Sequence, residues 1–138
     1  MISILQGGIT HHYMAPKLNY CNTVNNVGSI YNQYTIIMAG NKDVKAGIIR
    51  GTDSACGNIV GPLSSFRIND NFDFMLGGYN TNFNSFKKRN MIPVSFGNVT
   101  PIIGVDFKLF LYKSKSTSIS IDNLISFGII THAISWSF

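Results

Sequence analysis

The chain has 138 residues, of which 45% are hydrophobic and 12% charged, and its formal net charge is +5. This composition indicates one domain, 1–138, and excludes a disordered chain. The basic residues are too scattered to indicate nucleic-acid binding. The one short basic run, Lys87–Arg89, is typical of a solvated turn. Mean hydropathy is +0.15, high for a soluble protein, yet no run of about 18 apolar residues exists to form a spanning helix. Hydrophobicity spread over short segments favours a β-barrel, either in a membrane or, with its apolar face turned inward, in solution.

The first part of the chain predicts five strands joined by two long polar connections and two tight turns. The connections are Met14–Gly28 and Thr52–Gly61, and the turns have the Asn, Asp and Gly composition that tight turns favour. In the first strand, Thr10 and His12 share the parity expected to face the barrel interior. The predicted strands are Ile4 to Tyr13, Ile30 to Ala39, Val44 to Gly51, Pro62 to Ile68 and Phe72 to Tyr79.

The remaining part predicts three more strands after a long polar loop, Asn80–Asn98. In the sixth strand Pro101 lacks a backbone donor, so pairing should be interrupted near the loop end. The seventh strand, Thr117–Leu124, places Ser and Asp inward and Ile outward. In the closing strand, Gly128–Phe138, the residues expected to face outward are apolar. His132 is the exception, because it is an ionisable residue at one of these outward positions. The inward parity of the sixth strand is Gly104, Asp106, Lys108 and Tyr112, and the outward parity of the last is Ile130, Ile134, Trp136 and Phe138.

Short turns at one end and longer loops at the other are typical of outer-membrane barrels. The sequence therefore predicts an all-β, eight-stranded antiparallel up-and-down transmembrane barrel. We expect an integral protein of the bacterial outer membrane, with extracellular loops and periplasmic termini. Met1–Leu5 is too short for a secretory signal, so this interpretation treats the sequence as a mature chain.

Four short segments in this order resemble the lipid A palmitoyltransferase (PagP) family and its PagP-like small barrels, some of them phage-encoded. They are Gly7–His12, Arg50–Ser54, Ile92–Val94 and the aromatic C-terminus, and together they extend over nearly the whole chain. The resemblance implies an outer-membrane acyltransferase that moves a fatty acyl chain from a phospholipid to a lipid A-type acceptor. It also implies that His12, Asp53 and Ser54 are the residues of acyl transfer.

The residue types suit this chemistry, because acyl transfer needs a nucleophilic hydroxyl or water, a base and a group that orients the base. His12 would be the base, with Asp53 and Ser54 assisting; the alternative is that the Asp-Ser pair forms an ordinary turn. Neighbouring His11 and Arg50 are candidates for substrate binding. Arg50 would hold a lipid phosphate through a bidentate contact, or would instead be an interior or rim charge balanced by Asp53 or Asp106.

Two other functions remain open: a non-enzymatic surface barrel for host-envelope recognition or phage exclusion, and a lipid A deacylase or other esterase. The expected partners are phospholipid and lipopolysaccharide, without nucleic acid, cofactor or metal, and the expected state is a monomer. Cys21 and Cys56 would form a disulfide between two loops or stay as free thiols. The candidates for lining an acyl-chain site in the interior are Ile37, Ile102 and Phe110.

Overall fold

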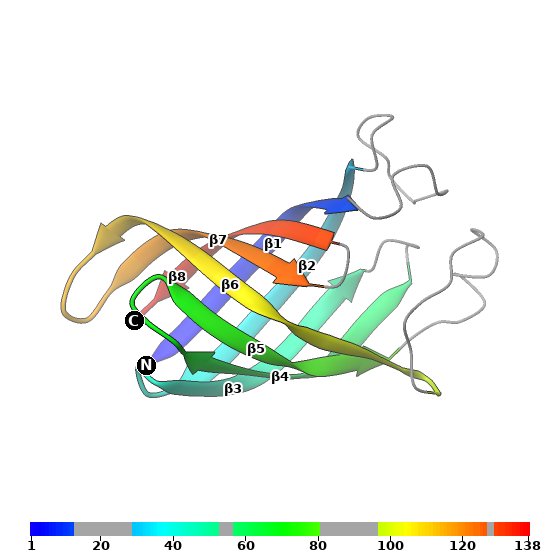
Figure 1. The fold of residues 1–138 in the computed structure, drawn as a ribbon, viewed down its shortest axis with the longest axis horizontal. Helices are drawn as coiled ribbons and strands as arrows, with labels where there is room; N and C mark the ends of the chain where they lie inside the picture. Colours follow the sequence, from blue (N-terminus) through cyan, green and yellow to red (C-terminus); the bar gives the residue numbers. More distant parts are fainter. Residues whose placement is uncertain (13–28, 53–56, 81–96, 127–128) are drawn as a thin grey trace.

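The computed structural model describes residues 1–12, 29–52, 57–80, 97–126 and 129–138, which form eight antiparallel strands closed into one barrel (Figure 1). Each strand pairs with the next in sequence, and the last pairs back onto the first. The prediction of an all-β, eight-stranded antiparallel barrel is confirmed. The strands are β1 (Ile2–His12), β2 (Ser29–Gly40), β3 (Val44–Thr52), β4 (Asn58–Arg67), β5 (Phe72–Asn80), β6 (Val99–Lys113), β7 (Ser118–Ser126) and β8 (Ile129–Ser137).

None of the described residues belongs to a helix long and apolar enough to cross a membrane.

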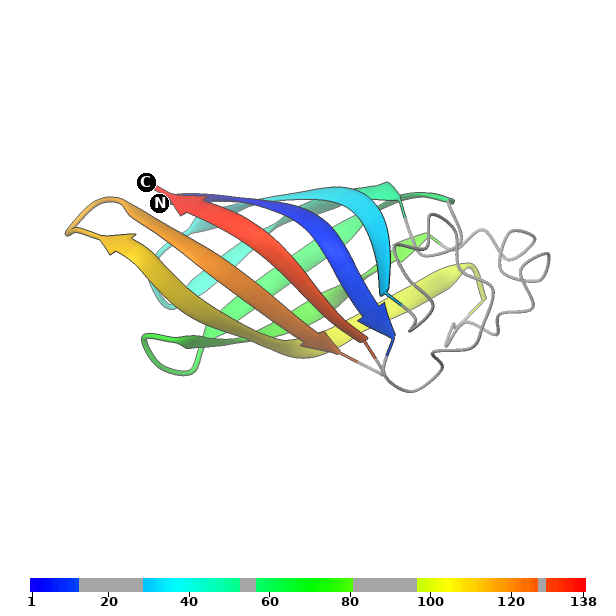
Figure 2. The same ribbon diagram turned by 90° about the horizontal axis from the view of Figure 1, so that it is seen from above.

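The chain ends and the three short turns lie at the same end of the barrel, which we call the turn end (Figures 1 and 2). The opposite end, where β1 ends and β2 begins, is called the loop end. Ile2 and Phe138 exchange two backbone hydrogen bonds of 2.7 and 2.9 Å, which bring the ends together. In the turn after β2, the Asn41 side-chain oxygen accepts backbone hydrogen bonds of 2.8 and 2.9 Å, and Asn69 does the same after β4 at 2.9 and 3.0 Å. The short asparagine side chain thereby stabilises each turn locally, as the sequence predicts.

One side of the barrel interior is apolar and the other side is polar. Strands β2 to β5 supply most of its apolar residues, whereas β6, β7, β8 and β1 supply most of its polar ones. Side chains of alternate residues point to opposite faces of a strand, so each strand contributes one inward set. The buried apolar residues are Leu5, Tyr34, Ile36, Met38, Ile49, Ile59, Leu63, Met75 and Ala133, and the buried polar residues are Ser3, Thr10, Ser65, Asp106, Ser120, Asp122, Thr131 and Ser135.

The prediction of which face of β2 points inward is wrong. Ile37 was expected to line the interior, but it is 47% exposed. The opposite face of β2 is buried instead, because Tyr34, Ile36 and Met38 join the apolar core.

Other face assignments depend on local register. Ile102 packs partly buried against the core, as expected, and Phe110 shares the inward parity of Asp106 and pairs with buried Ser120. Tyr112 was predicted inward but is 55% exposed, because a register shift between Phe110 and Tyr112 turns the strand over.

Two predictions about strand extent are also corrected. β4 begins at Asn58 rather than Pro62, so the connection before it is shorter than expected. Pro101 does not interrupt pairing with β5, where it lies opposite Gly78. On the other edge, pairing of β6 with β7 begins only at Gly104.

The outward face of the barrel is predominantly apolar over all eight strands. Ile134 and Trp136 are 47% and 38% exposed, which confirms the predicted outward parity of β8. Near the turn end the rings of Phe72 and Phe107 lie 4.9 Å apart. Other outward apolar residues are Ile2, Ile9, Ile37, Val44, Ile48, Val60, Phe66, Phe74, Leu76, Val99, Ile103, Leu109, Leu111 and Ile125.

Candidate functional site

A bulge in β1 decides which of two adjacent histidines faces the interior. Pairing with both neighbouring strands shifts between Gly7 and Ile9, so the inward parity changes there. Ile9 is 42% exposed and Thr10 only 2%. His12, two residues beyond Thr10 at the end of β1, therefore lies on the inward parity and His11 on the outward one. The side chain of His12 lies outside the described part of the structure.

Asp53 and Ser54 lie outside the described residues, as do Cys21 and Cys56, but the strand register limits how they can reach His12. β1 pairs up to His11 opposite Ser29 of β2, whereas β3 pairs up to Gly51 opposite Tyr34. At strand dimensions this stagger is roughly 16 Å along β2 and roughly 10 Å across two strand spacings. The strands alone do not bring the three residues together; a contact requires the segment after Thr52 to run toward the end of β1.

Three buried hydroxyl groups meet inside the barrel where β1 approaches its last residues, and we call them the hydroxyl cluster: Thr10, Tyr34 and Thr131. Thr131 Oγ1 lies 2.8 Å from Thr10 Oγ1 and 3.1 Å from Tyr34 Oη, and it donates to the Ile9 backbone oxygen at 3.2 Å. The cluster joins β1, β2 and β8 below the loop end. The sequence placed both threonines inward, but it gave Tyr34 no role.

Gly7 allows the Tyr34 ring to reach this cluster. A Cβ atom at Gly7 would lie 1.9 Å from the ring carbon that carries the Tyr34 hydroxyl. The ring therefore covers the glycine directly. Any side chain at this position would displace the ring and separate its hydroxyl from Thr131.

Replacing Tyr34 by phenylalanine is expected to lower the free energy of unfolding by about 1 kcal/mol, because one buried hydrogen bond is lost while Thr131 keeps its two other partners. Urea unfolding of the refolded barrel measures the change. The matched control is Tyr112→Phe, whose hydroxyl-bearing ring is 55% exposed and whose substitution should have no effect. Equal stability of the two variants would contradict a structural role for the Tyr34 hydroxyl.

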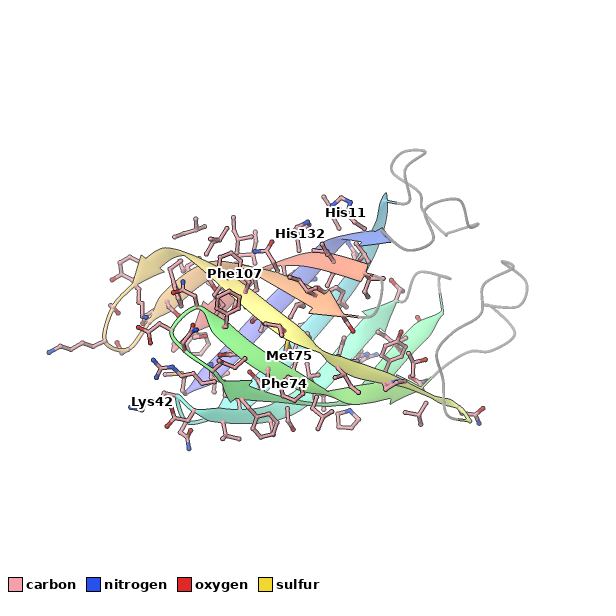
Figure 3. All side chains as sticks on the ribbon, viewed as in Figure 1. His11, Lys42, Phe74, Met75, Phe107 and His132 are labelled. Carbon is pink, nitrogen blue, oxygen red and sulfur yellow. The ribbon has the colours of Figure 1, made fainter. Side chains whose placement is uncertain are left out.

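The two predicted substrate-binding residues do not face the interior. Arg50 is exposed and follows buried Ile49 on β3, so it points outward near the loop end. An interior Arg50 balanced by Asp106 is therefore wrong, because Asp106 is buried inside the barrel and its Oδ2 lies 3.2 Å from Lys108 Nζ. A rim position for Arg50 agrees with the structure. His11 also lies on the outer side, where its ring contacts His132 (Figure 3).

The interior also holds a group of four ionisable residues, which we call the buried charge network: Asp73 on β5, Asp106 and Lys108 on β6, and Asp122 on β7. The Lys108 ammonium is hydrogen-bonded to Asp73 and ion-paired with Asp106, and Ser120 donates to Asp122. The sequence prediction that Asp106, Lys108 and Asp122 face inward is confirmed.

Toward the turn end the interior opens into a pocket of about 180 Å³, with Lys45, Asp73, Lys108 and Lys113 among its lining residues. Lys45 Nζ donates to Ser3 Oγ at 2.7 Å. This pocket lies at the opposite end of the barrel from His12, and Asp106 and Asp122 of the charge network lie at the middle of β6 and β7. None of them belongs to the predicted catalytic site.

Comparison of the chain with protein-family models, with curated proteins and with solved structures finds no match to any of them.

Proposed function

We propose that this chain spans a bacterial outer membrane, with the loop end outside the cell and the turn end in the periplasm. The outward apolar residues on every strand support this, since a membrane barrel must present an apolar band to lipid. Aromatic side chains such as Phe72, Phe107 and Trp136 lie outward on the turn-end half, as an interfacial girdle would. Outward polar side chains form hydrogen bonds between neighbouring strands. Thr35 Oγ1 donates to Gln6 Oε1 at 2.9 Å, and His132 Nδ1 lies at hydrogen-bond distance, 2.7 Å, from Asn123 Oδ1.

Membrane insertion can be tested with Trp136, the only tryptophan of the chain and an outward residue. When the barrel folds into vesicles, its fluorescence should shift to shorter wavelength and be quenched by bromine carried on the lipid acyl chains. Acrylamide in the aqueous phase should quench it weakly. A barrel that stays in solution, with Trp136 open to acrylamide and insensitive to brominated lipid, would show that the apolar wall does not enter a membrane.

Within the membrane we propose a PagP-like acyl transfer from phospholipid to a lipid A-type acceptor, with His12 as general base and Asp53 and Ser54 assisting. The observation that carries this proposal is the β1 bulge, which puts His12 on the inward parity at the loop end. The β2–β5 side of the interior is apolar, and β1 borders this side at β2. A base at the mouth of an interior with an apolar side is the arrangement that a fatty acyl substrate requires.

Mass spectrometry of lipid A and phospholipids from cells with and without the protein tests this function. We expect an added acyl mass on lipid A together with lysophospholipid, because transfer removes one acyl chain from the donor. A deacylase would instead release free fatty acid and add nothing to an acceptor. Unchanged lipids in cells that contain the folded barrel would overturn both enzymatic functions.

The second candidate is a non-enzymatic surface barrel, which would recognise or exclude partners through its loops. The packing of the Tyr34 ring over Gly7 favours it, because this ring occupies the interior close to the loop end. Exchange of residues 14–28 or 80–98 would then change the cellular phenotype, whereas His12→Ala would not.

A further inference from the structure

The pocket at the turn end, which we call the turn-end pocket, is lined by an excess of basic side chains. Its volume of about 180 Å³ far exceeds the roughly 10 to 15 Å³ that one water molecule requires. Six basic and two acidic residues line it, which gives the lining a formal net charge of +4, and the buried carboxylates of Asp106 and Asp122 are not part of the lining. The charged lining residues are Lys42, Lys45, Arg67, Asp70, Asp73, Lys108, Lys113 and Lys115. The pocket therefore has the size and the charge to hold an anion.

The two carboxylates of the lining are already paired. Asp73 accepts a hydrogen bond from Lys108, and Asp70 is ion-paired with Arg67 and lies 3.7 Å from the Lys113 ammonium. The other three basic residues of the lining have no carboxylate at ion-pair distance in the described part of the chain; they are Lys42, Lys45 and Lys115. An anion in the pocket would give these three their counter-charge.

Lys45 is the half-buried member of the three, whereas the other two are exposed. It lies on β3 on the inward parity of buried Ile49, and its ammonium donates to Ser3 Oγ at 2.7 Å. Ser3 Oγ in turn lies 2.7 Å from Ser137 Oγ, and this contact uses only one of the two hydroxyl hydrogens. Because burying a charge is costly without an opposite charge, an anion beside Lys45 is favoured over a neutral hydroxyl alone.

Lys42 and Lys115 bring two further ammonium groups to the same pocket from different turns. Lys42 lies in the turn between β2 and β3, seen at the turn end in Figure 3, and Lys115 lies in the turn between β6 and β7. A lysine ammonium is a compact charge with three rotatable donors. Several of them can therefore converge on one tetrahedral group, such as phosphate, without the planar geometry that a guanidinium imposes.

We propose that the turn-end pocket binds a phosphate group, held by Lys42, Lys45 and Lys115 together with a hydroxyl of Ser3 or Ser137. The group is that of dissolved phosphate or of a lipid head group at the same membrane surface, since both offer the same oxygens. The site lies at the opposite end of the barrel from His12, so it is independent of the proposed acyl transfer.

Calorimetric titration of the detergent-folded full chain with inorganic phosphate tests the site. Binding should saturate, and it should weaken as sodium chloride is added, because salt screens exposed charges. Lys45→Met should weaken binding at least about tenfold, since a charge-assisted hydrogen bond is lost. Lys42→Met and Lys115→Met, at exposed positions, should each weaken it by up to about fivefold. Gel mobility of unheated samples verifies that each variant is folded.

The matched control is Arg50→Met, which removes the same charge from the loop-end part of β3 and should bind phosphate like the wild type. Phosphate affinity that is the same in the wild type and in all three lysine variants would overturn the proposal. A loss in Arg50→Met as large as that in Lys45→Met would also overturn it, because binding would then follow net charge or the loop end.

Titration with a short-chain phosphatidic acid distinguishes the two sources of phosphate. An affinity equal to that of inorganic phosphate, with the same dependence on Lys45, assigns the site to dissolved phosphate. A much higher affinity that also depends on Lys45 assigns it to a lipid head group. Tight lipid binding that is unchanged in Lys45→Met would show that the lipid binds elsewhere and would contradict the head-group assignment.

Discussion

Acyl transfer by the His12→Ala variant is expected to fall to about 1% of the wild-type rate or less, while the barrel remains folded. A positioned general base contributes about 10²- to 10⁴-fold to such reactions. His12 is the last residue of β1 and its Cα pairs with Ile129, so the substitution changes a strand end and leaves the middle of the sheet as it is. The rate is measured by mass spectrometry of lipid A from cells that produce equal amounts of each protein.

The control for this variant is Gln6→Ala on the same strand, which removes an outward polar side chain and should leave the rate unchanged. Unheated gel mobility should be identical for all three proteins. If His12→Ala keeps wild-type activity, His12 is not the base, even when the wild type adds an acyl chain to lipid A. Loss of folded protein would be seen separately in the gel, and His12→Gln then offers a polar replacement of similar size.

Replacing Lys108 by methionine is expected to lower the free energy of unfolding by about 3 to 5 kcal/mol. Its ammonium group is the cation that Asp73 and Asp106 share, and the three side chains are only 13%, 13% and 4% exposed. Removal of one partner leaves charges buried without compensation, which is the costly way to break a buried ion pair. Denaturant unfolding of the refolded barrel measures the loss.

Lys113→Met is the matched control, because its side chain is 50% exposed and lies 3.7 Å from Asp70. Such a surface pair contributes at most about 1 kcal/mol. The double variant Lys108→Met, Asp106→Asn should recover part of the stability, since it removes one of the uncompensated charges. Equal effects of Lys108→Met and Lys113→Met would show that the network does not stabilise the barrel.

Much of the fold was predictable because turns and strand periodicity are local signals. The Asn41 and Asn69 turns and the alternation of β7 and β8 follow from neighbouring residues alone. The face of β2 was not predictable in this way, because both of its parities carry isoleucine. Only the partner strands, whose inward residues include Ile49 and Leu5, decide that Ile36 is buried and Ile37 is not.

The site was less accessible to prediction for the same reason. The inward position of His12 was expected from uninterrupted alternation, yet it depends on a bulge that changes parity after Gly7. Tyr34 in the hydroxyl cluster and the contact between His11 and His132 join strands distant in sequence. No local pattern contains that information. Asp53 and Ser54 lie outside the described residues, so their part in the site stays a prediction.

The pairing of β1 with β8 bears on how the barrel folds. This seam joins the two most distant strands of the sequence, and the Ile2–Phe138 hydrogen bonds complete it at the turn end. Contacts between distant segments form slowly, because the entropy of closing the intervening chain must be overcome first. The hairpins β2–β3, β4–β5 and β6–β7 have short turns and can form early. We therefore expect closure of the barrel to be the last step, in which the hydroxyl cluster and the contact between His11 and His132 form together.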